Sequence, residues 1–303
     1  MPDAGRVPLL RIRVFGGFDA ALDGTPIDES YSRQRKLQAL MAILALNHGQ
    51  ELYSDYLADS IWPRSTPSKK RHCFYNLWYV TMCAVCGTKR EGNPYFERRH
   101  HTCRLLDTYV LTDVEEVERA CDDLLDDGLK PAQAVAAYRR LQSAYRGDLL
   151  PGEAENPIIV RARLEWRERI AGSLSAAAQK MADAGEDRTA LWLASVACRL
   201  NGLREDVVRL RMRLFAKMGM HAYALRAYRE LEEVLHDEVG VSPSPQSVEL
   251  MQQVFDAGEL GFALRKGSAS RRRGSGLPNE RETCGKADLA YGNPLELRSG
   301  NMV

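Results

Sequence analysis

Basic side chains gather between residues 60 and 106, in a chain whose formal net charge is only +1. This segment contains nine basic residues and only two acidic ones, Glu91 and Glu97. The basic residues are Arg64, Lys69, Lys70, Arg71, Lys89, Arg90, Arg98, Arg99 and Arg104. Ammonium and guanidinium groups at this density attract anions, and nucleic acid is the most common extended polyanion. A solvated charged surface is the alternative interpretation.

The segment that follows Thr66 and Pro67 is predicted to be a helix, because proline suits the first helical position. It can run to Gly87 with one apolar stripe, which we assign to the core: Phe74, Leu77, Trp78, Thr81 and Val85. The opposite face carries Lys69, His72, Asn76, Tyr79 and Cys83. Asparagine pairs with adenine through two hydrogen bonds and lysine can reach guanine. Lys69, His72, Asn76 and Tyr79 are therefore the candidate base-contacting residues.

Other basic residues are candidate phosphate ligands. Lys70 and Arg71 lie near the start of the same helix, where backbone N–H groups also favour anions. Arg98 and Arg99 belong to a predicted hairpin, and a further set at the start of an earlier helix is expected to clamp the DNA backbone: Arg33, Arg35 and Lys36.

The elements around these residues follow from the hydrophobic period. Alternation predicts strands at 10–14 and 18–22, and Asp23-Gly24 is a hairpin turn signal. Helical spacing begins at Arg33 and ends near Gly49, and Ser54 can cap a second helix that stops at Pro63. Two β-like stretches, 95–98 and 102–106, follow the third helix. A sheet, three helices and a terminal hairpin are the order of a winged helix-turn-helix, in which the third helix enters the major groove.

From Asp113 onward the sequence predicts helices only, separated by glycines. Ala184-Gly185 before Ala190 recurs as Met218-Gly219 before Ala224, an offset of 34 residues that is typical of tetratricopeptide repeats. Such helix pairs must stack to bury their apolar faces. Residues 265–303 are polar and low in complexity, which predicts a disordered tail. The expected fold is mainly α with a small β component.

Composition limits the class of protein. The 303 residues are 45% hydrophobic and 27% charged, and no run of 18 apolar residues predicts a membrane span. The first residues lack the pattern of a secretory signal, and the seven cysteines are an odd number, so a cytoplasmic protein without a disulfide framework is expected. No catalytic or nucleotide-binding motif is found, which argues against an enzyme and against a cofactor.

Two other functions remain open. Cys73, Cys83, Cys86 and Cys103 share the first domain with three histidines, and Cys83-x-x-Cys86 has metal-ligand spacing, so a metal- or redox-sensing regulator is one alternative. A C-x-x-C pair inside a continuous helix diverges by about 60°, and free cysteine often packs as a small hydrophobe. The other alternative is a protein-interaction scaffold whose winged helix has lost DNA binding.

Short segments in both halves of the chain carry a family resemblance. Leu10-Arg11-Ile12-Arg13-Val14-Phe15-Gly16-Gly17-Phe18, Arg33-Gln34-Arg35-Lys36-Leu37 and Leu57-Ala58-Asp59-Ser60-Ile61-Trp62-Pro63 mark the first half. Tyr145-Arg146-Gly147-Asp148-Leu149-Leu150 and Ala227-Tyr228-Arg229-Glu230-Leu231, followed by Gly240, Pro243 and Pro245, mark the second. Together they resemble the bacterial antibiotic-regulatory-protein (SARP-like) activators, which join an OmpR-like winged helix to a bacterial transcriptional activator domain.

The resemblance implies a winged-helix DNA-binding domain at 8–107 and a tetratricopeptide-like activator domain at 108–258. It further implies a transcription activator that binds direct repeats in double-stranded DNA near a promoter, often as a homodimer, and contacts RNA polymerase. One departure is that Val80–Cys86 carries no charge where the family has an Arg-rich stretch. Either base reading moves to residues 69–76, or binding to DNA is weak.

Overall fold

The structure is a computed structural model that describes residues 6–86 and 93–272. The chain divides into two compact units, Met1–Gly258 and Glu259–Val303, so both domains expected from the sequence lie in the first unit. Within the described ranges, no helix is long and apolar enough to cross a membrane.

A four-stranded sheet opens the chain, in the order β3-β2-β1-β7. Its strands are β1 (Leu10–Arg13), β2 (Asp19–Leu22), β3 (Thr25–Pro26) and β7 (Val110–Thr112). The predicted hairpin turn is confirmed, since Asp23 and Gly24 both have positive φ, 45° and 84°, as a type I′ turn requires. Strands β1, β2 and β3 pair antiparallel, and β7 adds a parallel partner to β1, with Leu10 opposite Val110. This strand lies beyond the expected boundary at residue 107.

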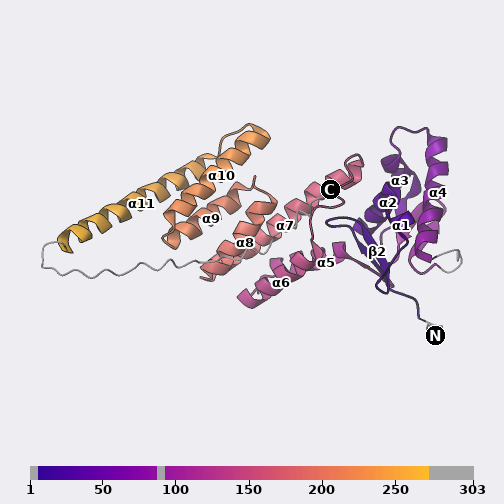
Figure 1. The fold of residues 1–303 in the computed structure, drawn as a ribbon, viewed down its shortest axis with the longest axis horizontal. Coiled ribbons are helices and arrows are strands. Elements are labelled where there is room, and N and C mark those ends of the chain that lie inside the picture. The colour runs from indigo at the N-terminus through magenta and orange to yellow at the C-terminus, as the bar shows by residue number, and fades with distance from the viewer. Residues whose placement is uncertain (1–5, 87–92, 273–303) are drawn as a thin grey trace, which may run out of the picture. The chain divides into compact units, whose positions relative to one another are not determined.

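Four helices and a second sheet complete the winged helix. The helices are α1 (Glu29–Ser32), α2 (Arg35–Leu46), α3 (Ser54–Ile61) and α4 (Pro67–Cys86), and Figure 1 shows α2, α3 and α4 packed together. The second sheet has the order β4-β6-β5, with β4 (Leu52–Tyr53), β5 (Phe96–Arg99) and β6 (Thr102–Leu105). The β5–β6 hairpin is the wing expected from the sequence. Its Phe96 packs edge-on against Trp78 of α4, with ring centroids 6.0 Å apart, which fixes the wing against the third long helix.

Two local predictions in this part are wrong. Arg33 does not begin the first long helix: it caps α1, which forms because the Asp28 side chain accepts a hydrogen bond from the Ser30 backbone N–H. Ser54 does not cap α3 either. It is the first helical residue, after an extended Tyr53, because its backbone N–H pairs with the His101 carbonyl at the wing.

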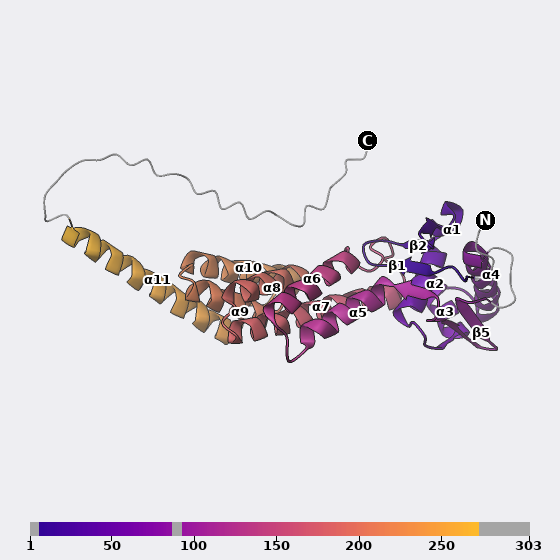
Figure 2. The same ribbon diagram turned by 90° about the horizontal axis from the view of Figure 1, so that it is seen from below.

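The rest of the first unit is helical, and Figure 2 shows its helices running alongside one another. The helices are α5 (Asp113–Leu125), α6 (Pro131–Ala144), α7 (Pro157–Asp183), α8 (Asp187–Leu200), α9 (Glu205–Lys217), α10 (His221–Val239) and the start of α11 (Pro245–Arg272). The fold is mainly α with small sheets, as the sequence predicted.

The 34-residue repeat is confirmed in the backbone. At the turn between α7 and α8, Glu186 N–H donates to the Met181 carbonyl, and 34 residues later Met220 N–H donates to Phe215. Gly185 and Gly219 hold the same left-handed conformation, φ 78° and 74°. These are the hydrogen bonds of a Schellman-type helix end, which needs a residue that tolerates positive φ.

The predicted disordered tail is partly helical. Helix α11 extends to Arg272, whereas the sequence predicted disorder from residue 265. No proline interrupts 259–272, and once a helix is formed each added residue gains one backbone hydrogen bond, so the helix propagates. The remainder of the predicted tail, 273–303, lies outside the described residues.

The winged helix and the helical repeats share a packed junction. Phe15, fully buried after β1, contacts the rings of Tyr145 and Trp166 at centroid distances of 5.1 and 5.6 Å. Asp113, only 2% exposed, accepts hydrogen bonds from the backbone N–H groups of Val14 and Phe15 at 2.8 and 2.9 Å. A buried aromatic cluster with paired backbone groups thus joins these two parts of the first unit.

Candidate nucleic-acid interface

Helix α4 presents two distinct faces. The buried side chains are Phe74, Leu77, Trp78, Thr81 and Val85, which confirms the predicted core stripe residue for residue. The four candidate base-contacting residues, Lys69, His72, Asn76 and Tyr79, are all exposed. Burial of one stripe therefore turns the polar stripe outward, as helical geometry requires.

Two of the candidate base-contacting residues form a hydrogen bond with each other. Asn76 Nδ2 lies 3.1 Å from His72 Nε2, one helical turn away. An asparagine amide has two N–H donors and one carbonyl acceptor, so this contact leaves one donor and the acceptor for a base edge. That pair is what adenine recognition needs in the major groove. His72 thus orients the Asn76 amide.

The basic residues at the start of α4 face carboxylates of α3. Lys70 Nζ donates to Asp59 at 2.8 Å, and the Lys70 side chain is only 15% exposed. Arg71 is 61% exposed, with its Nε 4.0 Å from Asp55. Lys70 is therefore committed to an ion pair between the two helices, whereas Arg71 keeps most of its guanidinium available to a phosphate.

The two wing arginines point to opposite faces of the hairpin. Side chains alternate along a strand, so Arg98 shares the face of Phe96, which packs on α4. The Arg98 guanidinium lies 4.3 Å from the centroid of the Tyr75 ring on α4, a cation–π contact. Arg99 lies on the other face, where its Nη2 is 2.8 Å from Glu97.

Glu97 organises that outer face of the wing. It also accepts from Arg104 at 2.6 Å, its directly opposite residue in the hairpin register. Partial desolvation raises the pKa of Glu97, but the hydrogen bonds from Arg104 and Arg99 outweigh it and lower the pKa, so the group is a carboxylate. The charge of Arg99 is thus largely compensated, whereas Arg98 has no carboxylate partner within the described part of the chain.

A hollow of about 590 Å³ separates α4 from the wing. Its lining combines aromatic rings with polar ends; the residues are Tyr75, Trp78, Tyr79, Met82, Asn93, Phe96, Glu97, Arg98 and His100. Arg98 and Tyr79 therefore reach the same concave surface from the wing and from the helix. Aromatic and guanidinium groups at the edge of a groove suit a nucleic-acid backbone.

The basic residues near the first long helix are less closely connected with this surface. Arg33 pairs with Glu29 at 2.6 Å, and Lys36 Nζ lies 4.8 Å from the centroid of the Trp62 ring. Arg35 is exposed at the start of α2. Their role in binding a phosphate backbone stays a prediction, and Lys89 and Arg90 lie outside the described residues.

The cysteines do not assemble into a metal centre in the described ranges, where no three His, Cys, Asp or Glu side chains converge. Cys73, Cys83 and Cys86 are half-buried on α4, and Cys103 is buried on β6. Burial raises the pKa of Cys103 to about 11 and also raises that of Cys86, so both are protonated thiols near neutral pH. Cys83 and Cys86 thus occupy two half-buried positions of the uncharged second half of α4.

Tyr75 and the pairing of Glu97 with Arg104 escaped the sequence analysis. Tyr75 stands four residues after Arg71 and four before Tyr79, so its spacing alone placed it on the exposed stripe. Glu97 and Arg104 are cross-strand neighbours once the two-residue turn His100-His101 fixes the register. Each signal was present in the sequence.

Comparison with known proteins identifies the second half. Residues 111–255 match the model of the bacterial transcriptional activator domain. The chain resembles the SARP-like activators in that a winged-helix N-terminal part precedes this domain. Two curated relatives are the regulatory protein AfsR of Streptomyces coelicolor, 26% identical over 280 residues, and the AfsR of Streptomyces griseus, 27% identical over 264 residues. These alignments cover 89% and 82% of this chain, but only 27% and 25% of the relatives.

A solved structure shows the same fold. The structure of Mycobacterium tuberculosis EmbR, determined in complex with a low-affinity phosphopeptide, superimposes with a TM-score of 0.62 at 17% identity. The match covers 88% of the SARP-like chain and 71% of EmbR. At this identity the likeness shows the shared fold alone.

Proposed function

We propose that this SARP-like protein is a sequence-specific, DNA-binding transcription activator of the cytoplasm. Helix α4 enters the major groove and the wing contacts the phosphate backbone. The observation that carries the proposal is the exposed stripe Lys69–His72–Asn76–Tyr79, backed by a fully buried core stripe and joined to Arg98 across one hollow.

The charge distribution supports the same role. The winged-helix part, residues 1–107, has a net charge of +4, and residues 108–266 have a net charge of −5. A polyanion is attracted to the first and repelled by the second. The acidic helical repeats are thus suited to protein partners, and we assign to them the contacts with a second copy of the chain and with RNA polymerase.

The uncharged second half of α4 favours base reading by its first half. Asn76 and His72 lie in the three turns that precede Val80, and Arg71 supplies a phosphate ligand beside them. One helix end with three or four base-reaching side chains is enough for a half-site, and two such half-sites in direct repeat give an operator for a homodimer.

The experiment is recovery of genomic DNA fragments by the purified chain, with elution at two salt concentrations. Enrichment of a repeated motif that survives the higher salt supports a specific regulator. Uniform recovery that disappears with salt would reduce the interface to a cationic patch, because non-specific binding rests on counterion release alone. A protein scaffold would then be the better explanation of the helical repeats.

A further inference from the structure

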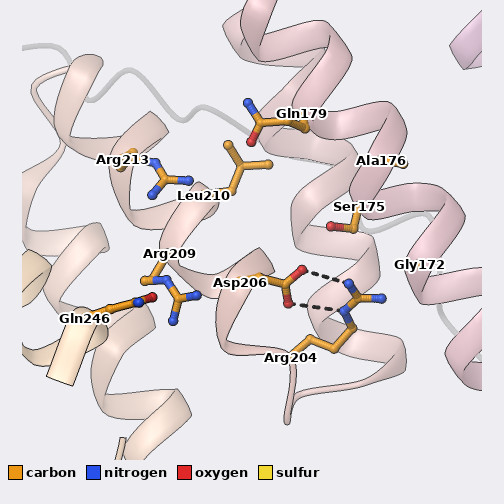
Figure 3. A pocket seen from close by; sticks show the side chains of 10 residues that line it. All are labelled: Gly172, Ser175, Ala176, Gln179, Arg204, Asp206, Arg209, Leu210, Arg213 and Gln246. Atoms are coloured by element: carbon orange, nitrogen blue, oxygen red, sulfur yellow. Dashed lines mark hydrogen bonds and ion pairs between the residues drawn. The ribbon is translucent and has the colours of Figure 1, made fainter. Parts of the chain in front are cut away.

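The helical repeats contain a second hollow, far along the chain from α4, with a volume of about 500 Å³. Figure 3 shows its lining, which we call the arginine hollow: Gly172, Ser175, Ala176, Gln179, Arg204, Asp206, Arg209, Leu210, Arg213 and Gln246. These residues come from α7, from α9 with its N-cap Arg204, and from the start of α11; α7 and α9 each begin a helical pair of the repeat, and α11 follows the second pair. Repeat stacks of this kind form binding surfaces along such alternate helices.

The three arginines of the hollow differ in how far nearby groups compensate their positive charge. Arg204 is occupied, since its guanidinium donates to Asp206 at 2.7 Å, as Figure 3 shows, and to Glu168 at 3.0 Å. Arg209 is held in place by the hydroxyls of Ser244 and Ser247, at 3.3 and 3.1 Å. Arg213 is exposed and makes no hydrogen bond or ion pair with any residue that the structure describes.

Arg209 and Arg213 form a cationic pair without full compensation. They are four residues apart on α9, so they lie on one face of the helix, where like charges repel. Glu205 is 3.7 Å from Arg209, but it is shared with the Ser244 and Ser247 hydroxyls, which donate to it at 2.6 Å each. A bound oxyanion would remove the repulsion and accept from both guanidinium groups.

The opposite wall leaves room for such an anion. Gly172, Ser175 and Ala176 are small and half-buried on α7, and in Figure 3 Ser175 and Gln179 face Arg209 and Arg213 across the hollow. A Cβ at Gly172 would lie 3.1 Å from Arg204 Nη1, which is closer than usual van der Waals contact. Glycine at this position therefore allows the Arg204–Asp206 pair to pack against α7. Ser175 and Gln179 add neutral hydrogen-bonding groups.

We propose that the arginine hollow binds a small molecule that carries a carboxylate or phosphate group. A compact ligand is favoured over an acidic peptide, because two carboxylates of α7 lie at the ends of the hollow and would repel the acidic residues of a longer ligand. Glu168 lies one turn before Gly172, and Asp183 lies one turn after Gln179, whose amide donates to it at 2.8 Å. The volume is also that of a small-molecule site, typically 300–1,000 Å³. This site goes beyond DNA binding and does not depend on it.

The test is titration calorimetry of the full chain with two probes, citrate and inorganic phosphate, in a buffer low in chloride. At least one probe should bind at a single site. Arg213→Gln should weaken that binding about tenfold or more, because one charge-assisted contact is lost. Arg213→Lys, which keeps the charge but not the planar fork, should weaken it less.

The matched control is Arg226→Gln on α10, which removes an arginine that is 74% exposed and lies outside the hollow. It should bind the probes as wild type does, and thermal melts should show all three variants folded. Binding of citrate alone assigns a carboxylate ligand, and binding of phosphate alone assigns a phosphate ester. Failure of both probes, equal binding by Arg213→Gln, or binding of an acidic peptide alone overturns the proposal. DNA is absent from every arm, so the result is independent of the proposed function.

Discussion

The two wing arginines should differ in their contribution to DNA binding. Arg98 reaches the hollow between α4 and the wing and has no carboxylate partner in the described part of the chain. Arg99, on the opposite face, is paired with Glu97 at 2.8 Å. Arg98→Ala should therefore weaken binding to every DNA sequence, whereas Arg99→Ala should have a clearly smaller effect.

The magnitude follows from counterion release. Each phosphate neutralised by the protein contributes about 0.9 to the slope of log K against log salt, so Arg98→Ala should flatten the slope by about one unit. Between about 50 and 200 mM salt, the ratio of the variant Kd to the wild-type Kd should then shrink about 3.5-fold. For Arg99→Ala the slope should change by less than about 0.5, since much of that charge is already compensated by Glu97.

The assay is fluorescence anisotropy on one labelled duplex at four or more salt concentrations, with wild type and both variants. Thermal melts serve as the control, because Arg98→Ala also removes the cation–π contact with Tyr75. If the slope of Arg98→Ala equals that of wild type, the wing does not contact phosphate. If Arg99→Ala has the larger effect, our assignment of the two hairpin faces is wrong.

Three further variants test the interface and the junction. Asn76→Ala should lose about 1–3 kcal/mol of discrimination between operator and scrambled duplex, with a modest loss of non-specific binding; an unchanged ratio of the two Kd values would contradict the role of the α4 face. Burial raises the pKa of Asp113 from 3.8 to about 6, so its contribution to stability is complete below the lower value and is lost as pH rises through the upper one. Asp113→Asn should flatten that decline in urea unfolding, and an identical pH profile would refute the assignment. Phe15→Ala should cost about 3–5 kcal/mol of unfolding free energy, and a cost below about 1 kcal/mol would mean that the aromatic junction adds little.

Much of the interface was predictable because a helix has a fixed period. The stripe from Phe74 to Val85 is apolar at helical spacing, so the sequence determined which face of α4 is buried and which residues, from Lys69 to Tyr79, are exposed. The wing was predictable for a similar reason, since two β-like stretches flank a short turn. The 34-residue repeat was readable from Gly185 and Gly219, because few other residues tolerate their positive φ.

Pairings between distant segments were not predictable in this way. The ion pair of Lys70 with Asp59 of α3, at 2.8 Å, is one example. The strand β7 pairs with β1 although about a hundred residues separate them, and the sequence pattern of three residues does not specify a partner. Nothing in the sequence distinguishes Arg209 and Arg213 from the other arginines of the helical segment. Only the fold brings residues of α7 and α11 to the same hollow.

The sequence by itself thus determined most of the long helices, the wing hairpin, the buried face of α4 and the glycine helix ends of the repeat, because each is a property of residues close together along the chain. The tertiary structure decided which charges are left uncompensated. Ion pairs such as Arg104–Glu97 and Lys70–Asp59 depend on the register of a hairpin and on the packing of two helices. A charge acts on DNA or on a ligand only if no carboxylate from another element reaches it first.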